Sequence, residues 1–208
     1  MSIYADSTSP GRRAPTIRNQ KVPIHRTNAA YRSREYLAEK EVETLMESAA
    51  SVGRRHGTRD AALILVAYRH GLRVSELVSL RWDQVDLRQG LLHVTRRKHG
   101  IASVHPLRGP ELRALRRLLR DYPETAYVFV SERKAPLTAD AVRKIIGRAG
   151  REAGIEFPVH PHMLRHATGY KLANDGQDTR AIQHYLGRRA ILPRYHHAGR
   201  PPWRFSER

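Results

Sequence analysis

Apolar residues recur along most of the chain at the spacing of an α-helix. Between residues 37 and 49 they lie three or four positions apart, and acidic residues gather in the first turns, at the positive end of the helix dipole. The run Ala61 to Ala67 is apolar throughout but too short to cross a membrane, so it predicts a buried central helix over about 58–70. Gly71 ends that helix, and we expect a short one to follow over 72–80.

Later segments predict further helices. Leucines recur on one side of residues 110–121, with arginines on the other. Thr138 and Asp178 are typical N-cap residues, and each precedes a helical apolar pattern. Residues 160–176 begin with a proline in the first turn and end at Gly176, where a left-handed C-cap is common. Helices therefore account for most of the ordered chain.

Strands are predicted in a few places. Residues 91–95 and 101–107 predict the two strands of a hairpin with its tip at 96–100, and residues 127–130 predict a short buried strand. The expected fold class is mainly α with a small antiparallel β-sheet (α+β).

The chain is strongly basic. Lys and Arg number 38 against 20 Asp and Glu, which gives a formal net charge of +18 and a pI of about 11.0. Such a balance favours a polyanionic partner, most often a nucleic acid. An anionic membrane surface and a solvated basic surface without a specific partner are the alternatives.

The composition also suggests how the chain is divided. Residues 1–34 hold many Arg, Ser and Pro but few large apolar residues, which predicts a basic arm that is disordered in isolation. Such an arm either lies along DNA phosphates or is an inert tail. Residues 35–187 predict one domain, and residues 188–208 form a tail rich in Arg and Pro.

Several classes of site and location are disfavoured by what the sequence lacks. It contains no cysteine, so disulfides and thiolate metal sites are excluded. It shows no long apolar run, and its N-terminus lacks the apolar core of a signal peptide. We therefore expect no membrane association and a cytoplasmic location.

The helix predicted over 160–176 carries the first candidate for chemistry. His162 and Arg165 are three positions apart, and His166 is expected on the same face. A guanidinium and an imidazole aimed together suit a phosphate oxygen, because the first donates in a fixed geometry and the second moves a proton near neutral pH. The alternative is a surface helix whose polar face holds these residues without a function.

Arg73 is the second candidate. It follows Gly71 at a junction of two helices, where backbone N–H groups and the helix dipole favour an anion. The alternative is an ion pair with Glu76, three positions along the chain.

Two groups of basic side chains suit contacts with DNA phosphates. One is at the hairpin tip, which could also be a solvated turn, and the other lies along the helix after Thr138. The residues expected to contact DNA are Arg96, Arg97, His99, Arg143, Lys144 and Arg148.

Four sequence boxes together resemble the tyrosine recombinase (phage integrase) family, and most of all its small fimbrial phase-switch recombinases. They are Gly71 to Leu77, the hairpin Lys98, His162 to His166, and Leu186-Gly187. The resemblance covers residues 35–187 and implies a recombinase catalytic domain. It implies site-specific recombination by integration, excision or inversion, in which a tyrosine cuts DNA through a 3′-phosphotyrosyl link.

The resemblance also implies roles for individual residues. Arg73 and Arg165 would bind the non-bridging oxygens of the scissile phosphate, Lys98 would protonate the departing 5′-oxygen, and His162 would assist proton transfer or contact the phosphate. Guanidinium groups suit a phosphoryl transition state, which gains charge on its equatorial oxygens. Neither a metal nor another cofactor is implied, because the covalent link stores the energy of the broken bond.

The tail departs from the family pattern. The family has a histidine directly after Leu-Gly and a tyrosine nine positions beyond it. Here Arg188 occupies the histidine position, and Tyr195 is two residues early. Tyr195 is either the nucleophile on a shortened loop, or the tail is out of register and the protein is an impaired recombinase that only binds DNA.

The resemblance further implies partners: double-stranded DNA with an inverted-repeat site, and a homotetramer on that DNA formed from free monomers. A metal hydrolase that uses His160, His162 and His166 is a weak rival, because Met163 stands where a zinc protease helix has Glu. A general nucleic-acid-coating protein would explain the charge but not the ordered boxes.

Overall fold

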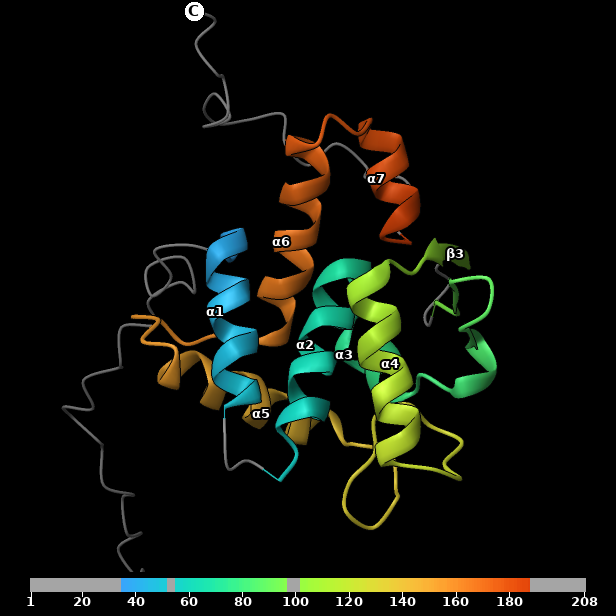
Figure 1. The fold of residues 1–208 in the computed structure, drawn as a ribbon. Helices are drawn as coiled ribbons and strands as arrows, with labels where there is room; N and C mark the ends of the chain where they lie inside the picture. The colour runs from blue at the N-terminus through green and yellow to red at the C-terminus, as the bar shows by residue number, and fades with distance from the viewer. Residues whose placement is uncertain (1–34, 52–54, 97–101, 188–208) are drawn as a thin grey trace, which may run out of the picture. The chain divides into compact units, whose positions relative to one another are not determined.

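The computed structural model describes residues 35–51, 55–96 and 102–187 of this 208-residue chain. Within these ranges helices predominate over a small set of strands (Figure 1). In chain order the elements are α1 (Glu39–Ala50), α2 (Gly57–His70), α3 (Val74–Val78), the 3-10 helix η2 (Trp82–Gln84), β1 (Val85–Asp86), β2 (Leu91–Val94), β3 (Ser103–Pro106), α4 (Gly109–Asp121), α5 (Ala139–Glu152), α6 (Pro161–Asn174) and α7 (Thr179–Tyr185).

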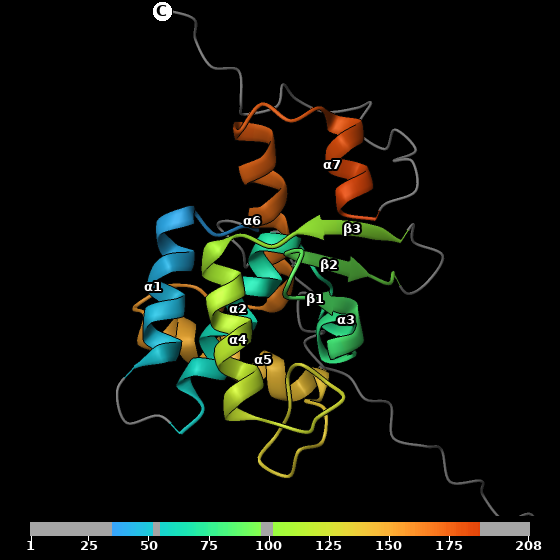
Figure 2. The same ribbon diagram turned by 45° about the vertical axis from the view of Figure 1, so that its right-hand side comes forward.

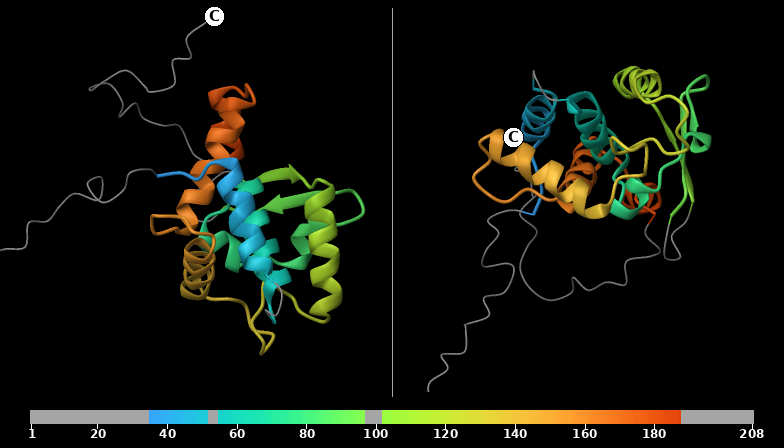
Figure 3. Two further views of the ribbon diagram at one scale, coloured as in Figure 1. Left: turned by 60° about the vertical axis from the view of Figure 1, so that its left-hand side comes forward. Right: turned by 90° about the horizontal axis from the view of Figure 1, so that it is seen from below.

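Helix α2 is the centre of the helical part, as its apolar run predicted. Its side chains Leu63, Ile64 and Val66 are fully buried, and it packs against α1, α4 and α6. Seen from below, α2 lies between α1 and α4 (Figure 3). Burying one such side chain contributes about 1.5–3 kcal/mol, so this contact holds the core together. The same contact fixes where α6 and the end of α2 lie.

The three strands form an antiparallel sheet in the order β1-β2-β3. Leu92 pairs with His105 and Val94 with Ser103, and all four side chains are buried. Residues between them point outward, as the two-residue period of a strand requires. Helix α7 contacts β3 and lies above it in Figure 2. The sheet therefore meets the last described helix along one edge.

The predicted helix caps are confirmed. Thr138 Oγ1 accepts a hydrogen bond of 3.1 Å from the N–H of Ala141 at the start of α5. Asp178 accepts bonds of 2.8 and 3.2 Å from the N–H groups of Arg180 and Ala181 at the start of α7. Each cap satisfies donors that a helix leaves without partners in its first turn.

The strand predicted over 127–130 is wrong, although most of the segment is buried. Tyr127 forms an isolated bridge with Arg81, and Val130 forms one with Pro136. The segment is thus bonded to two different loops and has no neighbouring strand. Its apolar residues were correctly placed inside, but a run of four cannot reveal its backbone partner. The two-residue strand β1 was missed because it is too short for a period to show.

Among the residues described, none of the helices has both the length and the apolar character needed to span a bilayer.

Candidate active site

Arg73 lies at the junction of α2 and α3, as predicted. Gly71 ends α2 in the left-handed conformation with φ 57°, and Arg73 precedes α3 with an extended backbone. Glu76 accepts a bond from the Arg73 backbone N–H and another from its guanidinium, both 2.9 Å long. The Arg73 side chain is nevertheless 37% exposed. Arg73 therefore forms the ion pair with Glu76 that was the alternative, and its guanidinium is also accessible to solvent.

Glu76 is a buried carboxylate held between two arginines. Arg96 Nη1 donates to its Oε2 over 2.8 Å, on the side away from the Arg73 guanidinium. Burial raises the pKa of Glu76, but the Arg73 N–H and the two guanidinium groups outweigh this effect, so the pKa lies below its usual value. The ionised carboxylate fixes the direction in which Arg73 points.

Arg96, which was expected to contact DNA, is buried in this structure. Its side chain is 0% exposed and lies between Glu76 and the end of α7, where Nη2 donates to the carbonyl of Tyr185 over 2.5 Å. The Arg96 side chain turns inward toward the buried Glu76 carboxylate, which would otherwise be left with an unpaired charge on this side. Strand β2 ends at Val94, so Arg96 belongs to the base of the hairpin and not to its tip.

Arg165 also differs from the prediction in its direction. It is 3% exposed and donates Nη1 to the carbonyl of Gly71 and Nη2 to the carbonyl of Leu186, the latter over 2.5 Å. His162 is exposed on the same helix, so the two side chains do not open on one face. His162 instead meets His166 edge to face, with ring centroids 4.5 Å apart. Arg165 points inward because the C-terminal ends of α2 and α7 both present backbone carbonyls that have no partner within their own helix.

Two glycines let these elements meet. A Cβ on Gly71 would lie 2.4 Å from Leu186, and one on Gly187 would lie 2.6 Å from Arg96 Nε. Both glycines also have positive φ, 57° and 62°. The glycines of the first and last sequence boxes are thus explained by one contact region that joins the ends of α2, β2 and α7.

Helix α5 carries the remaining DNA-binding candidates. Arg143 and Lys144 are exposed, and Lys144 forms an ion pair of 2.9 Å with Asp140 on the same helix. Arg148 is half-buried and donates to the buried Asp60 over 2.9 Å. Arg148 therefore differs from the exposed phosphate ligand that was predicted, because a buried carboxylate of α2 faces it.

The other candidates lie outside the described residues. They are Arg97, Lys98, His99, Arg188 and Tyr195.

Comparison with known proteins assigns the chain to a family. The sequence profile of the phage integrase family matches residues 35–198, a span that includes Tyr195. The chain belongs to the phage integrase family. It is a tyrosine-type site-specific DNA recombinase by family, as the resemblance implied, and the alternative of a remnant that only binds DNA is not favoured.

One relative of this recombinase is the type 1 fimbriae regulatory protein FimE of Escherichia coli K12. The two are 45% identical over 164 residues, which cover 76% of this chain and 82% of FimE. The crystal structure of XerA recombinase superposes with a TM-score of 0.67 at 30% identity, over 79% of this chain and 60% of that chain. A lambda integrase tetramer bound to a Holliday junction has a TM-score of 0.61 at 22% identity, over 74% of this chain and 47% of that chain. The predicted fold class is confirmed.

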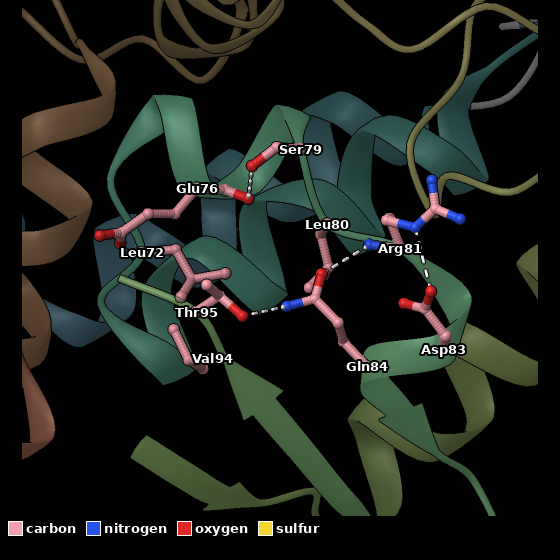
Figure 4. A pocket seen from close by; sticks show the side chains of 9 residues that line it. All are labelled: Leu72, Glu76, Ser79, Leu80, Arg81, Asp83, Gln84, Val94 and Thr95. Carbon is pink, nitrogen blue, oxygen red and sulfur yellow. Dashed lines mark hydrogen bonds and ion pairs between the residues drawn. The ribbon is translucent and has the colours of Figure 1, made fainter. Parts of the chain in front are cut away.

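Glu76 is among the residues that line a pocket of about 370 Å³ in the recombinase (Figure 4). Leu72, Leu80 and Val94 supply apolar walls. Gln84 closes one side by donating to Thr95 Oγ1 over 3.1 Å. The pocket lies between α3, η2 and β2.

A buried group of histidines lies under α7, and sequence reasoning missed it. His105 of β3 accepts or donates one bond of 2.9 Å with Ser103 and one of 3.3 Å with His70 of α2. Tyr185 stacks on His105 with centroids 3.8 Å apart, and Glu111 of α4 lies 3.8 Å from His70. The alternation of residues along the strand places His105 on its inward face, and this could have indicated a buried histidine.

These imidazoles are neutral at physiological pH. Burial, and after it the neighbouring His105, Arg96 and Arg69, together lower the pKa of His70 to about 3. Burial likewise lowers the pKa of His105 to about 4, with Arg96 as the next cause. The group helps to seat α7, because the Tyr185 hydroxyl also donates to the carbonyl of Arg69 over 3.0 Å.

No group of three or more His, Asp or Glu side chains suited to a metal ion occurs within the described ranges. His160, His162 and His166 thus form no such group there.

Proposed function

We propose that this recombinase cuts and rejoins DNA strands with Tyr195 as the nucleophile and Arg73 and Arg165 as ligands of the scissile phosphate. The observation that supports it most is Arg73, whose accessible guanidinium is held by a buried, ionised Glu76. Arg165 supports the same site, because it is bonded to Gly71 just before Arg73.

The proposed reaction is a transfer of the phosphoryl group. The Tyr195 oxygen attacks phosphorus and forms the 3′-phosphotyrosyl bond, while the bond to the 5′-oxygen breaks. Lys98 gives that oxygen a proton, and His162 takes the phenol proton or contacts the phosphate. The 5′-hydroxyl of a partner strand then reverses the step. The pentacoordinate transition state is stabilised by positive side chains, so the reaction needs no metal.

Arg188 occupies the position of the second family histidine. It can donate a hydrogen bond to a phosphate oxygen, but it cannot move a proton, because a guanidinium stays charged. We propose that role and no acid–base role for it. Tyr195 is supported by the family match, which runs through residue 198. Arg96 and Arg165 also anchor Tyr185 and Leu186, from which the chain continues toward Tyr195.

The proposed partner is double-stranded DNA with an inverted-repeat site, bound by a homotetramer that assembles from monomers. The exposed Arg143 and Lys144 of α5 suit contacts with the phosphate backbone, together with Arg97 and His99. A solved relative, lambda integrase, has been seen as a tetramer on a Holliday junction. Cytoplasmic residence stays a prediction.

A nicked DNA substrate tests the nucleophile. Duplexes are first selected for binding from a pool with random inverted half-sites and are then nicked beside the expected cleavage point, so that the cut fragment is lost and the adduct accumulates. We expect a covalent protein–DNA adduct with the wild type and none with Tyr195→Phe.

The control is Tyr170→Phe, which removes the hydroxyl of a residue of α6 that is 41% exposed and should leave the adduct intact. Absence of an adduct with wild-type protein on bound DNA would contradict the proposal. An adduct that survives in Tyr195→Phe would assign the nucleophile to another residue.

A further inference from the structure

Arg96 joins two parts of the candidate site that are distant in sequence. Its Nη1 bonds to Glu76 Oε2 over 2.8 Å, and its Nη2 bonds to the Tyr185 carbonyl over 2.5 Å. Glu76 in turn holds both the backbone and the guanidinium of Arg73. One buried side chain is therefore linked to Arg73 in one direction and to the end of α7 in the other.

The packing around Arg96 leaves it little freedom. Gly187 lies so close that a Cβ there would come within 2.6 to 2.8 Å of Arg96 Nε, Cδ and Cγ. The side chain is 0% exposed, so solvent does not compete for its donors. A displacement of Arg96 would have to move Glu76, the Tyr185 carbonyl or Gly187.

The chemistry of this contact requires a guanidinium. Its planar fork presents two terminal nitrogens at a fixed spacing, so it can bind a carboxylate and a carbonyl together. An ammonium is a single point and can be placed well for only one of them. The buried Glu76 charge also needs a cation beside it, because an unpaired charge in the interior is costly.

We propose that Arg96 is a positioning residue for strand cleavage, which sets Arg73 and the start of the tail in register. It acts on Arg73 through Glu76, and on the segment that leads to Tyr195 through the Tyr185 carbonyl. This inference rests on the proposed function, in which Arg73 binds the phosphate and Tyr195 attacks it. A loss of register between nucleophile and phosphate of about 1 Å costs about 100-fold in rate.

Arg59 provides a matched control for a purely structural role. It is also a buried arginine, and it also divides its donors between a carboxylate and a carbonyl: Asp60 over 2.7 Å and Val130 over 2.9 Å. Its partners lie on α2 and in the segment after α4. Arg59→Met and Arg96→Met therefore remove the same chemistry from two places.

The first measurement is the single-turnover rate of adduct formation with saturating nicked duplex, at a temperature where both variants are folded. We expect Arg96→Met to bind DNA like the wild type but to form adduct about 100-fold more slowly. Arg59→Met should keep the wild-type rate per folded molecule, and Arg96→Lys should show an intermediate rate. Equal rates for Arg96→Met and Arg59→Met would overturn the proposal.

The second measurement does not depend on cleavage. Hydrogen exchange should become faster in Arg96→Met at the amides of α3 and at Leu186 and Gly187, and it should stay unchanged there in Arg59→Met. Unchanged exchange at both places in Arg96→Met would overturn the positioning role even if the wild type cleaves. A wild type that forms no adduct would instead overturn the proposed function, and the exchange result would still decide the role of Arg96.

Discussion

The recombinase contains two buried carboxylates that are built alike and placed differently. Asp60 is held by Arg59 and Arg148, with bonds of 2.7 and 2.9 Å, and this Asp60 centre joins α2 to α5. Glu76 is held by Arg73 and Arg96, with bonds of 2.9 and 2.8 Å, and this Glu76 centre joins α3 to the end of α7. In each, one arginine is buried and the other is partly exposed.

The difference teaches that a buried ion pair is not a functional signal in itself. Pairs of this kind often add little net stability, since removing charges from water is costly. What separates the two centres is the group that each holds in place. The Asp60 centre holds helices of the core, whereas the Glu76 centre holds an accessible guanidinium and a helix end from which the candidate nucleophile follows.

Removing either carboxylate is the strongest way to test this contrast. Glu76→Ala and Asp60→Ala should each reduce the free energy of unfolding by about 3–5 kcal/mol, because each leaves buried positive charge without a partner. Urea unfolding followed by circular dichroism measures this loss. Adduct formation per folded molecule should fall with Glu76→Ala and persist with Asp60→Ala. An Asp60→Ala protein that is folded but forms no adduct would show that the two centres do not differ in their effect on cleavage.

Gly187 gives the next largest effect. Gly187→Ala should lower the stability by about 3 kcal/mol, because it combines strain at φ 62° with a Cβ placed 2.6 Å from Arg96 Nε. Gly176→Ala is the comparison: φ is 77°, but nothing lies within 4 Å of the added Cβ, so only about 1 kcal/mol is expected. Equal losses in thermal unfolding would mean that Arg96 does not confine Gly187.

Acid should first weaken the packing around the Glu76 centre and α7, where His70 and His105 are buried. The folded pKa values of His70 and His105 are about 3 and 4, below the ordinary 6.5, so between about pH 6.5 and 4 the unfolded chain binds more protons. The stability that these groups contribute is therefore present above pH 6.5 and is lost as the pH falls, by about 2 kcal/mol at pH 5 for each imidazole and about 4 kcal/mol for the two together. Urea unfolding at several pH values measures the slope.

The double variant His70→Gln/His105→Gln should flatten that slope. In the wild type at pH 5, hydrogen exchange should become faster at the amides of α7 than at the contact of α2 with α5. Arg96 is among the causes of both low pKa values, so we expect the loss of stability in acid to arise near the Glu76 centre. A slope that is unchanged in the double variant would assign the acid sensitivity to other groups.

Helix caps give the smallest expected effect. Thr138→Ala at α5 and Asp178→Ala at α7 should each cost about 1 kcal/mol, because each removes an acceptor for N–H groups of the first turn. Adduct formation should slow with Asp178→Ala and not with Thr138→Ala, because the end of α7 is bonded to the Glu76 centre through Arg96. A slower rate in Thr138→Ala instead would show that α5 contributes more than DNA contacts.

Much of the fold could be predicted because its cues are local. The central α2 follows from its apolar run, and the starts of α5 and α7 follow from Thr138 and Asp178, which need only their own first turns. The left-handed Gly71 and Gly176 follow from the freedom of glycine at helix ends. Residues 127–130 were misjudged because a strand depends on a partner elsewhere in the chain.

The sequence by itself determined the helices, the family and the identity of the basic residues that we propose for the phosphate site. Only the tertiary structure decided which of those residues face solvent. Arg96 and Arg148 turn inward because buried carboxylates of other elements meet them, and Arg165 does so because two helix ends offer carbonyls. Long-range partners leave no periodic trace in a sequence, since the spacing between them is set by the fold and not by a helix or a strand.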